Sequence, residues 1–315
     1  MGSESPSEKI KIRSLPLEER IRLYNKAIDL HKKYGWGYVR ISKKLSVPID
    51  VVRHWLYHGR IPIRQGHPHL FEPTPSPELA YVIGVVLGDG NLSQRKKSGE
   101  RSGRVIRLRA RDKEFVEKFA LAMSKLLRKR KPYKVVFENN QYRVYGYSFY
   151  LFEFLKKQFD TLKPFIEAYP TEFIKGVVDS EGSVKISVWR WKTYRALTVN
   201  VAITNTNLEL LLYVHELLRK HLGIESIIKP SYKAGSKFWR NGKEFTRKKD
   251  MYDLVITKLN DVKLFASRVG FSIKRKHQKL LDAIRICEDF KSGEERTEAW
   301  LKLYKKKNGR WARIK

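Results

Sequence analysis

Two short segments of the same design, 92 residues apart, constrain this chain more than any other feature. Residues 82–90 read VIGVVLGDG and residues 174–182 read IKGVVDSEG. Each places two small residues four positions apart, which on a helix form a flat stripe where two helices can touch backbone to backbone. The small residues are Gly84, Gly88, Gly176 and Ser180. Each segment then ends in a carboxylate followed by glycine, a residue that commonly terminates helices. We therefore predict two helices packed against each other, with Asp89 and Glu181 close together at their ends.

The two carboxylates are unfavourably placed unless a positive charge lies between them. The C-terminal end of a helix already carries partial negative charge, and two packed helices add the repulsion of one acid by the other. A divalent cation removes both problems, and Mg²⁺ typically binds through one or two carboxylates together with waters and substrate phosphates. We therefore predict a Mg²⁺ (or Mn²⁺) site at Asp89 and Glu181. Gly88 and Ser180, which directly precede the acids, are included in this predicted site.

The sequence after each segment follows the same order of elements, which indicates an internal repeat. An apolar helix leads into two strands, an amphipathic helix, two more strands and closing helices. The expected strands lie near residues 104–111, 133–147, 184–204 and 226–257. Asn241-Gly242 marks a hairpin turn within the last of these. The predicted fold class is α+β: two pseudo-symmetric αββαββ halves, residues 78–165 and 166–290, whose antiparallel strands form a saddle-like sheet.

Alternation along the predicted strands gives one face of the sheet an unusual charge. In VIRLRAR, residues 105–111, the apolar residues share one face, and Arg107, Arg109 and Arg111 share the other. Three arginines in a row repel one another unless an anion lies over them, whereas the alternative, an ordinary solvated face, usually mixes both signs of charge. Nucleic acid is therefore the expected partner of this face. The expected contacts are Arg104, Arg107, Arg109, Arg143, Tyr145, Lys185, Ser187, Trp189, Asn200, Lys233 and Lys276.

Composition agrees with a polyanionic partner. Lys and Arg number 66 against 33 acidic residues, a net charge of +33, and such an excess destabilises a compact chain unless a polyanion lies against it. Nucleic acid is the first candidate and an anionic membrane the second, and a basic binding protein without enzymatic activity is also compatible. The longest apolar run, residues 81–87, is too short to span a bilayer. The single cysteine excludes a disulfide framework and a multi-cysteine zinc site. An intracellular protein is expected.

The chain ahead of the repeat predicts a separate helical domain, residues 1–61. Three short helices with a turn at Ser46-Val47-Pro48 suit a helix-turn-helix, in which Arg53 and His54 point outward as DNA contacts. The alternative is a plain three-helix cap. The shared core would comprise Ile41, Leu45, Val47, Val52, Trp55 and Leu56. Residues 62–77 hold five of the 12 prolines and are expected to form a linker.

Two smaller features complete the predicted organisation. The histidines around the linker, His54, His58, His67 and His69, invite a metal interpretation. No carboxylate or cysteine completes a ligand set at the right spacing, so a metal site is not expected there. The last residues, 291–315, are expected to form a basic tail that adds to binding of nucleic acid.

The two glycine-spaced segments resemble the motif of the LAGLIDADG family in both copies, and the resemblance covers residues 77 to about 290. It implies a homing endonuclease that acts as a monomer and cuts both strands of a long duplex DNA site. By this resemblance Asp89 and Glu181 are the catalytic pair that holds Mg²⁺. Arg111 and Asn205 occupy the positions where the family often carries a basic or polar residue near the scissile phosphate.

The resemblance also extends to a segment late in the second half. Residues 271–281 (FSIKRKHQKLL) resemble the lysine-bearing segment of the family, so Lys274 or Lys276 is expected to reach the catalytic site. The alternative for either lysine is a phosphate contact remote from the chemistry. Arg111 is a poor proton acceptor, so a stabilising role fits it better than that of a base.

Two other functions are compatible with the same fold. A chain of this kind with a helix-turn-helix can be a transcription regulator that has lost cleavage, or an RNA maturase that assists intron splicing. Binding alone does not require the two acids, and both are present here. Their retention favours the endonuclease.

Overall fold

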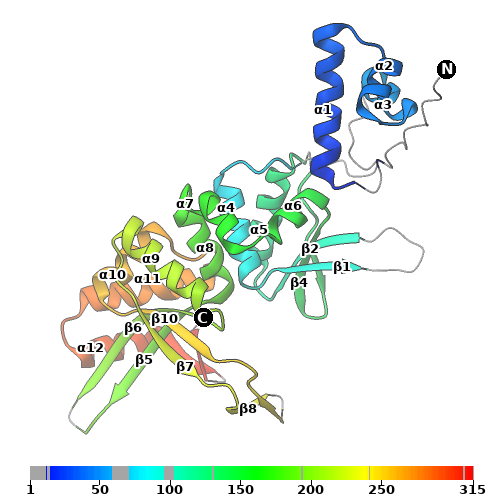
Figure 1. Ribbon diagram of the computed structural model, residues 1–315. Helices are drawn as coiled ribbons and strands as arrows, with labels where there is room; N and C mark the ends of the chain where they lie inside the picture. The colour runs from blue at the N-terminus through cyan, green and yellow to red at the C-terminus, as the bar shows by residue number, and fades with distance from the viewer. Residues whose placement is uncertain are drawn as a thin grey trace, which may run out of the picture. The chain divides into compact units, whose positions relative to one another are not determined.

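A computed structural model describes residues 12, 15–58, 71–95, 103–129, 131–192, 194–240, 242–307 and 309–314. The chain consists of two compact units, residues 1–68 and 69–315 (Figure 1). Most of the expected proline-rich linker, together with His67 and His69, lies outside the described residues, as does Asn241.

The N-terminal unit is a three-helix arrangement around one small core. Its helices are α1 (Leu17–Tyr34), α2 (Tyr38–Leu45) and α3 (Ile49–Tyr57). The hydroxyl of Ser42 donates to the carbonyl of Val47 at 2.7 Å, which fixes the turn between α2 and α3. Of the six residues predicted to share this core, five are buried and Leu56 packs against them half-buried. The three helices are therefore present, and whether they read DNA stays a prediction.

The larger unit contains two copies of one strand order. The first copy comprises α4 (Pro77–Leu87), β1 (Asn91–Arg95), β2 (Gly103–Ala110), α5 (Lys113–Leu126), β3 (Val136–Glu138), β4 (Gln141–Gly146), α6 (Phe149–Leu155) and α7 (Phe159–Glu167). The second comprises α8 (Pro170–Glu181), β5 (Gly182–Arg190), β6 (Arg195–Asn205), α9 (Leu208–Leu222), β7 (Ile227–Tyr232), β10 (Met251–Ile256), α10 (Leu259–Arg268) and α11 (Lys274–Asp289).

The strand orders β1-β2-β4-β3 and β5-β6-β10-β7 are the same when the strands are counted within each copy, and every pairing is antiparallel. The predicted α+β class with two αββαββ halves is confirmed. The second copy carries one insertion between β7 and β10, the two-stranded ribbon of β8 (Lys237–Arg240) and β9 (Lys243–Thr246).

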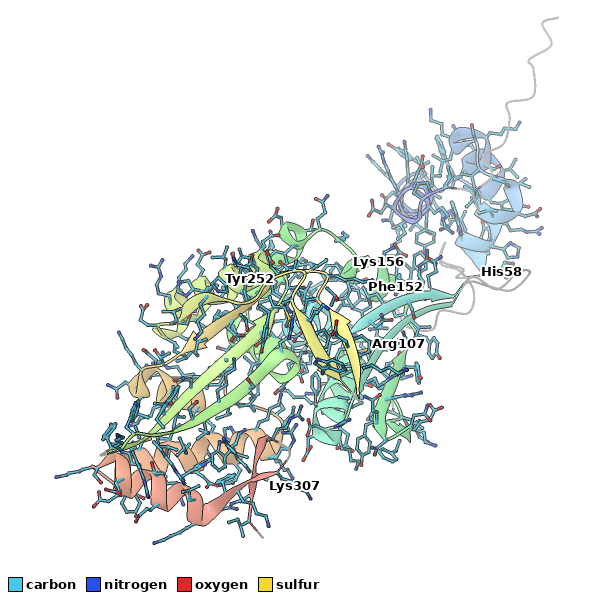
Figure 2. All side chains as sticks on the ribbon, turned by 90° about the horizontal axis from the view of Figure 1, so that it is seen from below. His58, Arg107, Phe152, Lys156, Tyr252 and Lys307 are labelled. Carbon is cyan, nitrogen blue, oxygen red and sulfur yellow. The ribbon has the colours of Figure 1, made fainter. Side chains whose placement is uncertain are left out.

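Each sheet buries one face against helices, as the alternation predicts. In β2 the side chains of Ile106 and Leu108 are buried, and in β6 those of Val199 and Val201 are buried. They join one continuous core that also contains the residues of α4 and α8. The other faces carry the polar and basic residues. Figure 2 views the unit from below, and Arg107 is seen on this side of the strands.

Residues 291–315 are not a free tail, which corrects the expectation from sequence. They form α12 (Gly293–Leu303) and the paired strands β11 (Tyr304–Lys307) and β12 (Arg310–Arg313). Trp300 is fully buried and stacks on Tyr304 with ring centroids 4.0 Å apart. The indole of Trp311 donates to the carbonyl of Ile186 in β5 at 3.0 Å. Three aromatic residues thus anchor a segment whose charge alone suggested a solvated tail.

Within the described parts of the chain, no helix combines the length and the apolar character that crossing a membrane requires.

Candidate functional site at the ends of helices α4 and α8

Helices α4 and α8 touch through their backbones. A Cβ atom built on Gly84 would lie 2.3 Å from the carbonyl oxygen of Phe173, and one built on Gly176 would lie 2.4 Å from the carbonyl oxygen of Tyr81. Real Cβ atoms do not approach other atoms so closely, so only glycine fits either position. The predicted contact between the two small-residue stripes is present in the structure.

The contact continues to the ends of the helices. A Cβ on Gly88 would lie 2.6 Å from Cβ of Ser180 and 3.4 Å from Cγ of Glu181. Asp89 directly follows Gly88, and Glu181 is the last residue of α8. The close packing therefore delivers one carboxylate from each half to the same end of the helix pair.

The electrostatics of the two acids show that they share one environment. Burial raises the pKa of Glu181 to about 7, and the negative charge of Asp89 adds to this rise. Desolvation also raises the pKa of Asp89, while the charge of Lys276 opposes the shift. Both acids are therefore held where their ionised forms are disfavoured, and a bound cation would relieve this.

Two further groups from the second half lie at the carboxylates. The side-chain amide of Asn205 donates to Oε1 of Glu181 at 3.3 Å. The ammonium of Lys276 donates to the carbonyl of Gly182 at 2.8 Å and lies 3.4 Å from the carbonyl of Asp179. Burial lowers the pKa of Lys276, and the neighbouring Arg275 lowers it further.

Two residues that we expected at the catalytic site, Lys274 and Arg111, have no such contact with the acids among the described residues. Lys274 begins α11 and is exposed, and Arg111 is exposed directly after β2. Among the described residues, no hydrogen bond or ion pair joins Lys274 or Arg111 to the acids. Of the two candidate lysines, the structure thus brings Lys276 to the site and leaves Lys274 at the surface.

A buried carboxylate beside the site was missed from sequence. Asp179 is 1% exposed. It accepts from the hydroxyl of Tyr81 at 3.0 Å and from the backbone amide of Ser272 at 2.7 Å. Asp179 therefore ties α8 to α4 and to the residues just before α11, which carries Lys276. The sequence did contain a signal for this role, because Asp179 is an acid within the apolar helix α8 at the position where the first copy has Leu87.

A second missed contact joins the two halves directly. The guanidinium of Arg275 donates through two nitrogens to both oxygens of Asp112, at 2.6 and 2.7 Å. Asp112 precedes α5 in the first half, and Arg275 lies next to Lys276 in the second. This two-point contact fixes the start of α11, and with it Lys276, against the first half.

The expected DNA contacts divide between two groups. Arg109, Lys185, Trp189 and Lys233 are exposed, and Arg107, Tyr145, Ser187 and Asn200 are partly so. Lys185 also pairs with Asp253 at 2.7 Å. In the N-terminal unit, Arg53 pairs with Asp50 at 3.0 Å, and His54 lies half-buried on the same helix.

Two arginines do not fit the predicted sheet face. Arg104 lies an even number of positions from Ile106, so it points to the helix side, where it pairs with Glu153 and lies 4.2 Å from the ring of Phe149. Arg143 is on the expected face but is only 8% exposed, and it pairs with Glu138 at 2.6 Å. An arginine that already has an acid partner is less available to a phosphate.

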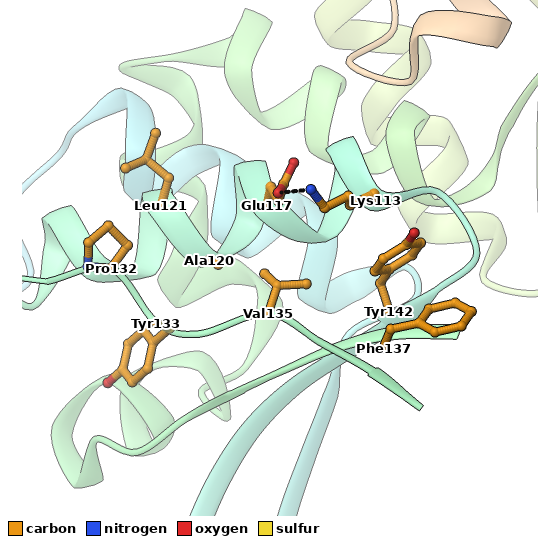
Figure 3. A pocket seen from close by; sticks show the side chains of 9 residues that line it. All are labelled: Lys113, Glu117, Ala120, Leu121, Pro132, Tyr133, Val135, Phe137 and Tyr142. Carbon is orange, nitrogen blue, oxygen red and sulfur yellow. Dashed lines mark ion pairs between the residues drawn. The ribbon is translucent and has the colours of Figure 1, made fainter. Parts of the chain in front are cut away.

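The described residues contain no group of three or more His, Cys, Asp or Glu side chains placed to hold a metal. Any cation at α4 and α8 would therefore have two carboxylates as its charged protein ligands. An open pocket elsewhere lies between α5 and the residues leading into β3 (Figure 3). Lys113 and Glu117 pair at 3.0 Å on its wall. None of the predicted site residues lines it, so the candidate site is the open end of the helix pair.

Comparison with known proteins places this geometry in a family. A model described as LAGLIDADG-like domain matches residues 168–270. The uncharacterized protein MJ0398 of Methanocaldococcus jannaschii is 31% identical over 279 residues, which cover 86% of this chain and 96% of that protein. A second protein of the same organism, MJ0314, is 34% identical over 160 residues, 48% of this chain and 57% of its own length.

Two solved structures match part of this chain at lower identity. The homing endonuclease I-DmoI, in complex with DNA and Mn, is 23% identical over 62% of this chain and 97% of its own, with a TM-score of 0.45. I-LtrWI, a LAGLIDADG homing endonuclease bound to target DNA, is 9% identical over 72% of this chain and 96% of its own, with a TM-score of 0.46. The duplicated glycine-packed helices, the two like sheets and the family match together show that this chain belongs to the LAGLIDADG family.

Proposed function

We propose that this chain is a site-specific homing endonuclease that hydrolyses phosphodiester bonds on both strands of a duplex DNA site. The observation that carries the proposal is the convergence of Asp89 and Glu181 at the end of two helices in backbone contact, where the pKa of Glu181 is raised to about 7. A protein that only bound DNA would gain nothing from two mutually repelling acids placed against a polyanion.

The donor set fits a hard divalent cation. Asp89 and Glu181 offer carboxylate oxygens, and Gly88 and Ser180 lie directly beside them at the helix ends. Mg²⁺ or Mn²⁺ bound there would supply the positive charge that activates water and stabilises the leaving oxygen.

The chain's own residues have separate tasks around these acids. Asn205 holds the Glu181 carboxylate in one orientation through its amide. Lys276 keeps a positive charge beside both acids, because two backbone carbonyls fix its ammonium, and this charge would stabilise the negative charge that develops on the phosphate. The exposed cations and polar residues of the two sheets would hold the duplex, with the chain acting as an intracellular monomer.

The N-terminal unit would act as a helix-turn-helix that adjusts site choice without taking part in the chemistry. Its α2 and α3 are joined by a short fixed turn, and α3 presents Arg53 to solvent. Removal of residues 1–61 should weaken or relax DNA binding and leave cleavage of a core site intact. Loss of all cleavage by a core that still folds would contradict this division.

The test of the main proposal is cleavage of a randomised duplex library with Mg²⁺ or Mn²⁺, followed by sequencing of the cut ends. The selected site is then placed in a supercoiled plasmid and treated with the wild type, Asp89→Asn and Glu181→Gln. We expect either change to reduce cleavage of both strands by about a hundred- to a thousandfold. DNA affinity should be kept, since each amide preserves shape and removes a charge that repels phosphates.

Two outcomes would contradict the proposal. Linear product at the wild-type rate from either variant would remove the acids from the chemistry. No product from the wild type on any sequence, with either metal, would favour the regulator. A nicked plasmid from one variant would show instead that each acid serves one strand.

A further inference from the structure

The far end of the β5–β6 hairpin carries three aromatic rings stacked on one another. Trp189 and Trp191 have ring centroids 6.0 Å apart with planes at 20°, and Trp191 and Tyr194 have centroids 5.4 Å apart with planes at 29°. The backbone amide of Trp191 donates to the carbonyl of Tyr194 at 2.8 Å, which closes the turn. We call these three residues the aromatic ladder. Figure 1 shows the ends of β5 and β6 extending beyond the other strands of their sheet.

The aromatic ladder is open to solvent. Trp189 is 50% exposed, Trp191 57% and Tyr194 55%. Three adjoining large rings at this exposure form an apolar patch of the kind that marks a binding surface. The stacked rings stiffen the hairpin, although a single pair of side chains across the two strands would be enough to do so. The rings at the two ends of the stack each keep one face free for a ligand.

The strands that carry the aromatic ladder are basic along the sequence, although the first turn of α12, with Glu294 and Glu295, lies against the backbone of Arg195. Arg190, Lys192 and Arg195 alternate with the rings, and the sequence between Glu181 and Glu209 contains no acidic residue. Among the described residues, no ion pair joins any of these three cations to an acid. Trp189 also lies on the strand face of Lys185 and Ser187, opposite the buried Val184 and Ile186. The partner of this patch is therefore flat, able to stack and negatively charged.

We propose that the aromatic ladder binds unpaired nucleobases of a single-stranded nucleic acid segment. Stacked aromatic rings with interleaved cations suit bases whose faces are free, with the phosphates following the cations. A paired duplex is a poorer fit, because its bases cover each other's faces and expose only edges in the grooves.

The location makes this a separate site. Trp189 is eight residues beyond Glu181 along β5, so it lies about 25 Å from the carboxylates at the usual rise of a strand. The aromatic ladder therefore contacts nucleic acid well away from the position of any bond cut at α4 and α8. Its ligand can be tested without cleavage, and the inference does not depend on the endonuclease proposal.

The experiment compares three fluorescent probes with equal numbers of phosphates on the full-length protein: oligo(dT), oligo(rU) and a blunt DNA duplex. Affinity is measured by anisotropy in EDTA, over a salt series that separates the electrostatic part from the rest. The variants are Trp191→Ala with Tyr194→Ala, and the conservative Trp191→Phe. Trp239→Ala is the matched control, since Trp239 is 71% exposed on the separate β8–β9 ribbon and stacks on no ring among the residues that the structure describes.

We expect the double alanine variant to lose about ten- to a hundredfold in affinity for a single strand, the size of one or two lost base stacks. The affinity of the double alanine variant for the duplex should change less than about threefold. Trp191→Phe should bind all three probes nearly as the wild type does. Trp239→Ala should change the affinity for single strands and for the duplex by the same factor. Whether oligo(dT) or oligo(rU) loses more identifies the source of the bases. Wild-type tryptophan emission should fall on binding, and less so in the variants.

Two results would overturn the inference. Equal losses on single strand and duplex would make the aromatic ladder a groove contact. Unchanged affinity for all three probes, from variants that melt like wild type, would exclude nucleic acid and leave a protein partner for the patch.

Discussion

The two halves of the larger unit share a strand order, yet the groups around their carboxylates differ. In the first half the apolar helix α4 ends at Leu87 and is followed by Gly88-Asp89, and in the second α8 ends in Asp179-Ser180-Glu181. The buried acid Asp179, the amide of Asn205 and the ammonium of Lys276 all come from the second half. The first half contributes Asp89, and its Arg111 stays at the surface.

The helix contact is common to both halves, whereas the groups around the acids come mainly from one half. The backbone contact between α4 and α8 needs small residues on both sides, so it is symmetric. The positive charge at the site needs to be supplied only once, because Lys276 acts on both acids. A duplicated fold can therefore hold one asymmetric site, and substitutions at equivalent positions of the two halves show where the asymmetry lies.

The largest effect should come from the cation. Replacing Lys276 by Met removes the ammonium that lies beside both acids, and we expect cleavage to fall about a hundredfold. Lys274→Met and Arg111→Met, which remove exposed cations, should stay within about threefold. The measurement is single-turnover cleavage of the selected site. A larger loss from Arg111→Met than from Lys276→Met would show that the first half supplies the charge after all.

A symmetric effect is expected from the helix contact. Gly84→Ala and Gly176→Ala each force a methyl group against a carbonyl oxygen at 2.3 or 2.4 Å, and each should cost about 1–3 kcal/mol of unfolding free energy. Leu121→Ala, at a side chain 46% exposed on α5, should cost less than about 0.5 kcal/mol. Urea unfolding measures all three. A glycine variant as stable as the wild type would remove the backbone contact as the joint between the halves.

The buried acid should behave asymmetrically. Asp179→Asn and Tyr81→Phe each disturb the same hydrogen bond, so each should cost about 1–3 kcal/mol and the double variant should show a coupling of about 0.5–3 kcal/mol. Leu87→Asn, at the equivalent position of the first half, should show no coupling to Tyr81→Phe. Strict additivity of Asp179→Asn and Tyr81→Phe would contradict the contact.

The smallest effect concerns pH. The folded protein raises the pKa of Glu181 from 4.5 to about 7, so it binds this proton more tightly than the unfolded chain does. The resulting stabilisation is complete below about pH 4.5 and is lost as the pH rises through 7. Glu181→Gln lacks this loss. In EDTA, we expect the wild type to lose about 2–4 °C in Tm relative to Glu181→Gln between pH 5 and pH 8, the effect of about 1 kcal/mol after allowance for partial exposure.

Calorimetry at both pH values measures this difference. If the difference in Tm between the wild type and Glu181→Gln were the same at both pH values, the pKa of Glu181 would not be raised in the folded protein. Addition of Mg²⁺ at pH 8 should raise the Tm of the wild type and leave that of Glu181→Gln nearly unchanged.

Local pattern was enough to predict the parts of the fold that rest on spacing. Glycine spacing predicted the α4–α8 contact, and the alternation of residues 105–111 predicted the buried face of β2. The repeat predicted two strands after α4, but the position of the short strand β1 was not predicted, because NLSQR has no alternation of apolar and polar residues. The C-terminal segment was misjudged because its lysines outweighed Trp300, Tyr304 and Trp311, although its capping box at Ser292 and Glu295 was a readable helix start.

The site was predictable as far as its two acids and no further. The choice between Lys274 and Lys276 depends on the rotation of α11, which is fixed by contacts made far away in sequence. One of these is the pairing of Arg275 with Asp112, 163 residues apart. Such a long-range contact leaves no periodic trace in a single sequence. The placement of Arg104 on the DNA-facing side was wrong for another reason, since the alternation itself puts Arg104 on the side of the buried Ile106 and Leu108.

The contact between Gly84 and Gly176 also bears on how the two halves can change over time. It is made mainly of main-chain atoms, which every sequence supplies alike, so it demands little agreement between the side chains of the halves. The side-chain contacts between the halves include Tyr81 with Asp179, Arg275 with Asp112 and Tyr213 with Glu167. A half grafted from a relative would have to match these positions and the apolar residues that both halves contribute to one core. The exposed sheet faces of the two halves can therefore diverge independently. Exchange of one half between relatives could combine the sheet faces of two different proteins in one chain.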